Sequence, residues 1–126
     1  MTAYRAIVLE HFRHPRNRGS LLDANRAADG ANMLCGDRIR IQLRVVDDRI
    51  VEARFTADAC ALCIATASLL TEHIRGLRPD DAVAIDGNWI RASLDGDPPP
   101  GRMRCATLPV DTLRRAVREG RLVDEL

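Results

Sequence analysis

Residues 38–76 read RIRIQLRVVDDRIVEARFTADACALCIATASLLTEHIRG, and this stretch decides the fold. Polar and apolar residues alternate with a period of two over residues 38–46, a pattern typical of a strand with one buried face. Turn-forming residues follow at positions 47–49, and residues 50–56 predict a second strand. One face of this second strand is expected to carry Val51, Ala53 and Phe55. The stretch therefore predicts an antiparallel hairpin.

A long helix pattern follows the hairpin. Residues 61–75 are rich in Leu, Ile and Ala, and Gly76 supplies a stop signal. We expect this helix to cover the apolar face of the sheet. Ahead of the hairpin, residues 4–14 predict an amphipathic helix that Pro15 ends, and residues 16–32 read as a loop with one weak strand. The pattern favours an α+β fold.

The remaining part of the chain predicts two further helices. Pro79 suits the start of a short helix, which Gly87 is expected to interrupt. Apolar residues over positions 108–117 indicate a last amphipathic helix. Pro109 is expected within the opening turn of that helix, because only there is a missing N–H tolerated without penalty. Cys105 is then expected at or just before the helix N-terminus.

Composition narrows the class of protein. The 126 residues (14.0 kDa) predict one domain, residues 1–126, and the 46% hydrophobic and 29% charged residues are typical of a soluble globular chain. No apolar run is long enough to span a membrane, and the N-terminus lacks a secretory signal pattern, so we expect a cytoplasmic protein with reduced thiols. All 19 basic residues are Arg, at a net charge of +1, which argues against lysine chemistry and against nucleic-acid binding.

Three of the four cysteines lie at predicted element edges. Cys60 precedes the long helix, and Cys105 holds the corresponding position on the last helix, where the helix dipole favours a thiolate. Cys35 lies in the turn Cys35-Gly36-Asp37, where the glycine lets a thiol and a carboxylate converge. Three thiolates and one carboxylate make a tetrahedral set suited to zinc or iron rather than calcium or magnesium. The predicted metal ligands are therefore Cys35, Asp37, Cys60 and Cys105.

Other residues suit alternative roles. Cys63 lies inside the long helix and is interpreted as a core residue, although Cys60-Ala61-Leu62-Cys63 also matches the CxxC spacing of a thiol–disulfide oxidoreductase. The three histidines lack a second ligand at the spacing of a zinc site and are interpreted as structural. Arg104 would stabilise a neighbouring thiolate through its fixed charge.

Several segments together resemble the IscU/SufU/NifU-N family of iron–sulfur cluster assembly scaffolds. They are residues 11–19 (HFRHPRNRG), Cys35-Gly36-Asp37, Cys60 with the following Ile-Ala-Thr-Ala-Ser at residues 64–68, and residues 104–108 (RCATL). Residues 35–40 and 104–108 are more similar to the SUF type, SufU, but the chain lacks the insertion which that type carries between its second and third ligand cysteines. It also has Arg104 where the ISC type has a histidine, and residues 98–102 do not reproduce the ISC-type chaperone motif.

This resemblance implies a fold, a role and partners. The fold would be a small, mainly antiparallel three-stranded sheet packed against helices. The chain would accept sulfur from a pyridoxal-phosphate cysteine desulfurase, bind iron or a transient iron–sulfur cluster, and serve recipient apo proteins as a scaffold rather than as a catalyst. The implied ligands are Cys35, Asp37, Cys60 and Cys105, with Cys105 as the persulfide acceptor. The SUF type implies an alternative, a persulfide relay with zinc at the same site.

Two further hypotheses remain open at this point. In the first, the four ligands form a closed, purely structural zinc site, and chelation would unfold the chain. In the second, the protein is a thiol–disulfide oxidoreductase that depends on Cys60 and Cys63 and does not need Cys35 or Cys105. The sequence does not identify the oligomeric state.

Overall fold

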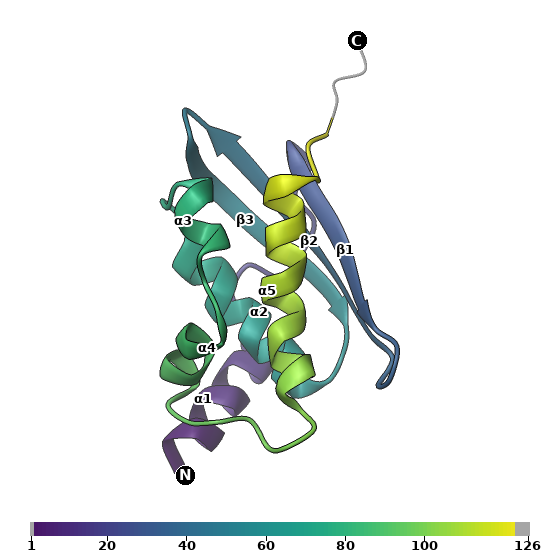
Figure 1. Ribbon diagram of the computed structural model, residues 1–126, viewed down its shortest axis with the longest axis vertical. Coiled ribbons are helices and arrows are strands. Elements are labelled where there is room, and N and C mark those ends of the chain that lie inside the picture. The colour runs from purple at the N-terminus through teal and green to yellow at the C-terminus, as the bar shows by residue number, and fades with distance from the viewer. Residues whose placement is uncertain (1, 123–126) are drawn as a thin grey trace.

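The computed structural model describes residues 2–122 as a three-stranded sheet packed against helices (Figure 1). The strands are β1 (Arg26–Asn32), β2 (Asp37–Val46) and β3 (Arg49–Asp58), in the order β1-β2-β3, and both pairs are antiparallel. The helices are α1 (Thr2–Arg13), α2 (Ala61–Ile74), α3 (Pro79–Val83), α4 (Gly87–Leu94) and α5 (Met103–Arg118). This confirms the predicted α+β fold with a small antiparallel sheet.

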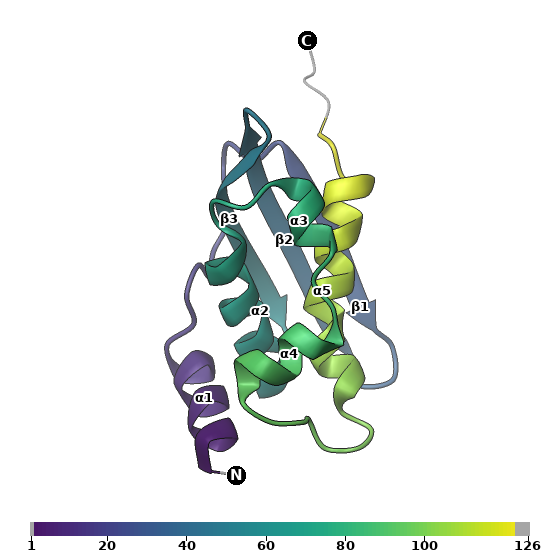
Figure 2. The ribbon, with the colours of Figure 1, turned by 60° about the vertical axis from the view of Figure 1, so that its left-hand side comes forward.

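Helices α2 and α5 form the layer that covers the sheet. Helix α5 packs on β1 and β2, α2 packs on β3, and the two helices contact each other. Helix α1 lies against α2 on the side away from α5, as the rotated view in Figure 2 shows. The core between the layers is almost entirely aliphatic, as the scarcity of aromatic residues predicts, and its largest fully buried side chains include Phe55, Ile41, Leu43, Ile50, Leu70 and Leu113. None of the described helices is long and apolar enough to cross a membrane.

The β2–β3 hairpin contains a bulge that the alternating pattern does not reveal. Arg44 pairs with Glu52 and Val45 pairs with Ile50, so Val51 is an extra residue on β3. Beyond the bulge the faces exchange, which buries Ile50 and leaves Val51 exposed. The prediction that Val51 shares the buried face of Ala53 and Phe55 was therefore wrong, because the period of two breaks at the extra residue.

Strand β1 is longer and more regular than the expected weak strand. It pairs with β2 along its whole length, from Arg26 opposite Leu43 to Asn32 opposite Asp37. Its residues are mostly Ala and Gly, which have little strand propensity, so the strand depends on pairing and on contact with α5. Gly30 shows why small residues are needed, since an added Cβ there would collide with Thr112 of α5.

Helix α2 follows the prediction closely, whereas α4 was not predicted. Helix α2 ends at Ile74, two residues before Gly76, whose φ of 92° suits glycine. The residues after Gly87 form α4 because the Asp86 carboxylate caps the helix, accepting hydrogen bonds from the backbone N–H groups of Asn88 and Trp89. Gly87 thus begins a helix rather than interrupting one.

The start of α5 also differs from the expectation. The helix begins at Met103, so Pro109 is its seventh residue and Cys105 lies within the first turn. The prediction that Pro109 belongs to the opening turn was wrong. Pro109 has no N–H to donate to the carbonyl of Cys105, but its buried ring packs in the interior and α5 continues past it. Cys105 is consequently held by the helix rather than by the preceding loop.

Candidate metal centre

Cys35 and Asp37 are presented by the tight connection between β1 and β2. The backbone N–H groups of Cys35 and Gly36 both donate to the carbonyl of Asn32, at 3.3 and 2.8 Å, and Gly36 adopts a φ of 75°. This positive φ turns the chain so that Cys35 and Asp37 point to one place. Asp37 is the first residue of β2 and is 3% exposed, whereas Cys35 is exposed.

Cys60 is joined to Asp37 by two contacts. Cys60 is the N-cap residue of α2, and its backbone N–H donates to Oδ1 of Asp37 at 2.9 Å. Its thiol lies 3.5 Å from Oδ2 of the same carboxylate. The Asp37 side chain therefore connects the start of β2 to the start of α2, and it holds the Cys60 sulfur at the site.

Cys105 joins Cys35 and Asp37 from the first turn of α5, and these three residues, without Cys60, form the compact set of possible ligands. Its sulfur lies 3.7 Å from the sulfur of Cys35, and the Cys35 thiol lies 3.2 Å from Oδ2 of Asp37. Ligand atoms of Cys35, Asp37 and Cys105 all lie within 4.8 Å of one another. Residues far apart in the sequence thus meet where the β1–β2 turn, the start of α2 and the start of α5 come together, in the lower part of Figure 1.

The geometry of this group suits a tetrahedral cation. Two sulfurs that each lie about 2.3 Å from a tetrahedral zinc ion are about 3.8 Å apart, close to the observed separation of Cys35 and Cys105. The Asp37 carboxylate lies within reach of both the Cys35 and Cys60 sulfurs and supplies a harder oxygen donor. Two sulfurs and one oxygen therefore lie at the spacing of a metal site, and the donor chemistry of the full predicted set, with Cys60, suits zinc or iron.

The electrostatics of the site favour a protonated Cys105 thiol beside an ionised Asp37 carboxylate. Burial acts to raise the pKa of Asp37, but hydrogen bonds from the Cys35 thiol, the Cys60 backbone and the Cys60 and Cys105 thiols outweigh it and lower that pKa. Burial, followed by hydrogen bonds with Cys35 and Cys60, raises the pKa of the Cys105 thiol to about 12. Cation binding would displace the proton of the Cys105 thiol, so metal affinity should rise with pH.

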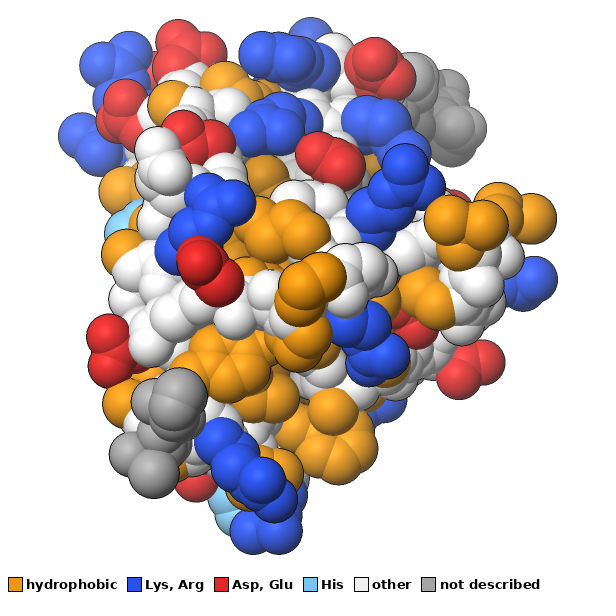
Figure 3. All heavy atoms as spheres, turned by 60° about the horizontal axis from the view of Figure 1, so that its bottom comes forward, with side chains coloured by type: hydrophobic (Ala, Val, Ile, Leu, Met, Phe, Trp, Pro, Cys, Tyr) orange, Lys and Arg blue, Asp and Glu red, His pale blue; other side chains and the backbone are white. Residues whose placement is uncertain are grey.

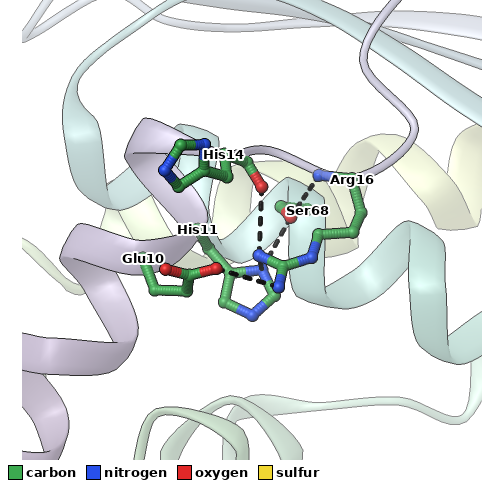
Figure 4. A network of polar contacts seen from close by, with 5 residues as sticks. All are labelled: Glu10, His11, His14, Arg16 and Ser68. Carbon is green, nitrogen blue, oxygen red and sulfur yellow. Dashed lines mark hydrogen bonds and ion pairs between the residues drawn. The ribbon is translucent and has the colours of Figure 1, made fainter.

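The histidines lie outside this group, as the sequence predicts. Figure 4 shows the buried His11 ring with Nδ1 2.7 Å from Oγ of Ser68 on α2. The backbone N–H of Arg16 donates to the same Ser68 oxygen at 2.8 Å, and the Arg16 guanidinium reaches the His14 carbonyl and Glu10, each at 3.0 Å. This network fastens the end of α1 to α2. His73 is exposed, and its ring lies 5.1 Å from that of Trp89 on α4.

Cys63 and Arg104 occupy different environments. The Cys63 side chain is fully buried in the aliphatic core, in agreement with its interpretation as a core residue. Arg104 is exposed beside Cys105, so its charge lies at the surface next to the site.

The structure also shows an exposed apolar surface beside the site that was not predicted from the sequence. Met33 and Leu34 are 88% and 81% exposed, directly before Cys35. Together with residues of α5 they line a groove of about 530 Å³ beside the site, formed by Ala31, Asn32, Met33, Leu34, Arg104, Thr107, Leu108 and Asp111. Figure 3 looks toward this end of the molecule, where apolar side chains are exposed between arginines. Two large apolar residues within a turn were the signal in the sequence.

Known proteins resemble the chain in both sequence and structure. The sequence profile of the NifU-like N-terminal domain matches residues 3–121. The iron–sulfur cluster assembly scaffold protein IscU of Escherichia coli K12 is 37% identical over 120 residues, covering 91% of each chain. IscU 1 of Archaeoglobus fulgidus is 37% identical over 114 residues, covering 90% of this chain and 74% of the relative.

Crystal structures show the same fold. One is an iron–sulfur cluster assembly scaffold protein for the SUF system from Fervidobacterium islandicum, with a TM-score of 0.77 and 22% identity, covering 93% of this chain and 98% of that one. Another is the N-terminal part of a NifU-like protein from Brucella abortus, with a TM-score of 0.75 and 21% identity, covering 92% of both chains.

Proposed function

The chain belongs to the family of NifU-like N-terminal domains, and from this we propose that it is a scaffold on which an iron–sulfur cluster is assembled before it passes to a recipient protein. The proposal is supported by the ligand atoms of Cys35, Asp37 and Cys105, which lie within 4.8 Å of one another, and by the two contacts of Cys60 with the Asp37 carboxylate. Thiolates are the protein ligands of iron–sulfur clusters, and four ligand positions suffice for a small cluster.

A scaffold must hold its cargo firmly enough to build it and loosely enough to release it. Helix starts and a turn supply the three sulfurs here, and the site reaches the surface through the exposed Cys35 and the half-buried Cys60. Asp37 would be the weaker, harder ligand whose exchange opens the site for release. The chain would then act as a carrier rather than as a catalyst.

Sulfur would reach the site as a persulfide from a pyridoxal-phosphate cysteine desulfurase, with Cys105 as the acceptor. The Cys105 side chain is 2% exposed, so acceptance requires local opening of the first turn of α5 or transfer through Cys35, whose sulfur is 3.7 Å away. In either route a thiolate attacks the outer sulfur of the donor persulfide, and the donor cysteine leaves as a thiolate. A Cys105→Ser chain that accepts sulfur normally would contradict this assignment.

Zinc fits the same donor set and would make the resting protein a zinc-bound sulfur acceptor. One thiolate would then have to leave the metal before it could attack the donor persulfide. The donor set alone does not favour zinc over iron, and the SUF-like segments support a SUF-type role, in a cytoplasmic setting and with apo iron–sulfur proteins as recipients.

Anaerobic cluster assembly tests the proposal. The full chain would be incubated with iron and inorganic sulfide, and separately with iron, cysteine and a cysteine desulfurase, while visible absorption is recorded. Sulfide-to-iron charge-transfer bands should form and should be lost in Cys35→Ser, Cys60→Ser and Cys105→Ser chains. Thr107→Ala is the matched control, because Thr107 lies near the site on α5 but bonds only to the Arg104 carbonyl.

The outcomes separate the competing hypotheses. Bands that persist in all three serine variants would overturn the scaffold. A chain that loses its circular dichroism on chelation and forms no cluster would instead be a structural zinc domain. Reduction of disulfide substrates that needs Cys60 and Cys63 but not Cys35 or Cys105 would identify a thiol–disulfide oxidoreductase.

A further inference from the structure

Cys63 is the one cysteine that the proposed cluster site does not use. It lies one turn inside α2, and its side chain is fully buried. It follows Cys60 by three residues, and the Cys60 thiol lies 3.5 Å from Oδ2 of Asp37 at the proposed site. Burial is the main cause that raises the pKa of the Cys63 thiol, so this thiol keeps its proton at neutral pH. A fourth thiol therefore lies within one helical turn of a proposed ligand.

Cys60 and Cys63 lie at either end of the first turn of α2. Cys60 is the N-cap residue with an extended backbone (φ −69°, ψ 167°), and its side chain makes no capping hydrogen bond. Side chains three residues apart on a helix share a face, with Cβ atoms about 5–6 Å apart, and a disulfide needs about 3.5–4.5 Å. A small adjustment at a helix end, where the backbone is least constrained, joins the two sulfurs.

Cluster assembly requires a reduction that the ligands alone cannot supply without loss of the site. A persulfide carries sulfur one oxidation level above sulfide, so each sulfur needs two electrons, from a pair of thiols, before it can enter a cluster. If Cys35 and Cys105 supplied them, their disulfide would remove two of the three sulfur ligands. A pair that includes Cys63 removes only one.

We propose that Cys63 is an internal reductant that converts sulfane sulfur on Cys60 to sulfide. The Cys63 sulfur attacks the Cys60 sulfur of the persulfide, a Cys60–Cys63 bond forms, and the bond between Cys60 and the outer sulfur breaks. The outer sulfur takes up both electrons and leaves with the protons of the thiol and the persulfide as hydrogen sulfide. Cys63 is oxidised, the outer sulfur is reduced, and one chain delivers one sulfide until an external dithiol restores the pair.

This inference rests on the proposed function, because it assumes that sulfane sulfur reaches the site. It differs from a general thiol–disulfide oxidoreductase, since the oxidant is the chain's own persulfide and not a substrate disulfide. Sulfur accepted on Cys105 or Cys35 would first move to Cys60 by the same kind of exchange, in which a thiolate attacks the outer sulfur.

A single-turnover measurement tests the role of Cys63. The full reduced chain is treated with one equivalent of inorganic polysulfide, desalted, and incubated anaerobically without added thiol. Samples are alkylated over time for intact mass and peptide mapping, and released sulfide is measured. The expected result is a persulfide that decays as sulfide and a Cys60–Cys63 disulfide appear together in equal amounts.

Variants and mapping make the test decisive. Cys63→Ala and Cys63→Ser chains should keep the persulfide, with sulfide release at least about tenfold slower. A wild-type chain that keeps its persulfide, or one whose disulfide maps to Cys35 and Cys105, would overturn the inference and leave the scaffold intact. A wild-type chain that forms no persulfide and assembles no cluster from inorganic sulfide would instead refute the scaffold proposal.

Discussion

Asp37 is the residue on which release of the cargo depends in this account. Its carboxylate is the single hard donor among three sulfurs, so replacement by alanine should remove the ligand that exchanges most readily. We expect an Asp37→Ala chain to hold an assembled cluster longer than the wild type, measured as the half-life of the charge-transfer absorption during transfer to an apo ferredoxin. Asp58→Ala, at an exposed acid on β3, is the control. Faster loss from Asp37→Ala would contradict the role.

Ser68 has a structural role that can be measured separately. Its buried hydroxyl lies 2.7 Å from His11 Nδ1 and accepts the Arg16 backbone N–H at 2.8 Å, so Ser68→Ala leaves the buried His11 ring and the half-buried Arg16 N–H without this partner. The free energy of unfolding should fall by about 1–3 kcal/mol in urea titrations. Ser20→Ala, at an exposed position, should change it little. Equal effects of the two substitutions would show that this network does not fasten α1 to α2.

His11 makes the stability of the fold depend on pH. Burial first, and then the positive charge of Arg16, lower its pKa below the usual 6.5, and the carboxylates of Glu72 and Glu10 oppose this in part. The unfolded chain therefore takes up the proton more readily, and stability falls as pH drops through about 6.5 and below. Urea titrations at a series of pH values should show this fall, which His11→Gln should reduce and His14→Gln, at an exposed site, should not. If the stability of the His11→Gln chain depended on pH as that of the wild type does, His11 would not be the source of the pH dependence.

At the scale of the elements, the β1–α5 contact positions Cys105 relative to Cys35. A Cβ on Gly30 would meet Thr112 and Leu108 of α5, so Gly30→Ala should push the helix away from the sheet. We expect a loss of about 1–3 kcal/mol in unfolding free energy and weaker zinc binding in competition titrations. Adding Thr112→Ala to Gly30→Ala should restore part of the unfolding free energy and part of the zinc affinity, because it removes the Thr112 hydroxyl that lies nearest to the new Cβ. Ala31→Ser, on an exposed neighbour, is the control, and wild-type zinc affinity in Gly30→Ala would refute the link.

The helices and strands differ in how far a short stretch of sequence determines them. The hairpin, α2 and the edge positions of three cysteines follow from alternation, helix composition and turn residues, all of which are visible in a short window. The bounds and regularity of strand β1 could not be predicted, because its Ala- and Gly-rich sequence becomes a strand only beside β2 and α5. The bulge at Val51 and the position of Pro109 inside α5 could not be predicted either, because tertiary packing determines both features.

For the whole molecule, the sequence supplied the ligand set but not its accessibility. Cys35, Asp37, Cys60 and Cys105 were selected from their positions at element edges and from the family resemblance. The structure places ligand atoms of Cys35, Asp37 and Cys105 within 4.8 Å of one another, and Cys60 reaches them through its contacts with Asp37. Whether they bind metal remains a prediction. The burial of Cys105, the exposure of Cys35 and the groove beside them arise from the packing of α5 against the β1–β2 turn, which no local pattern encodes.

X-ray absorption spectroscopy on the chain loaded with one zinc ion tests the central claim most directly. The account predicts three sulfur neighbours at about 2.3 Å and one oxygen at about 2.0–2.2 Å from the metal. Cys35→Ser, Cys60→Ser and Cys105→Ser should each reduce the sulfur count to two. A first shell with one sulfur or none, or one that all three substitutions leave unchanged, would show that these side chains do not form a single metal centre.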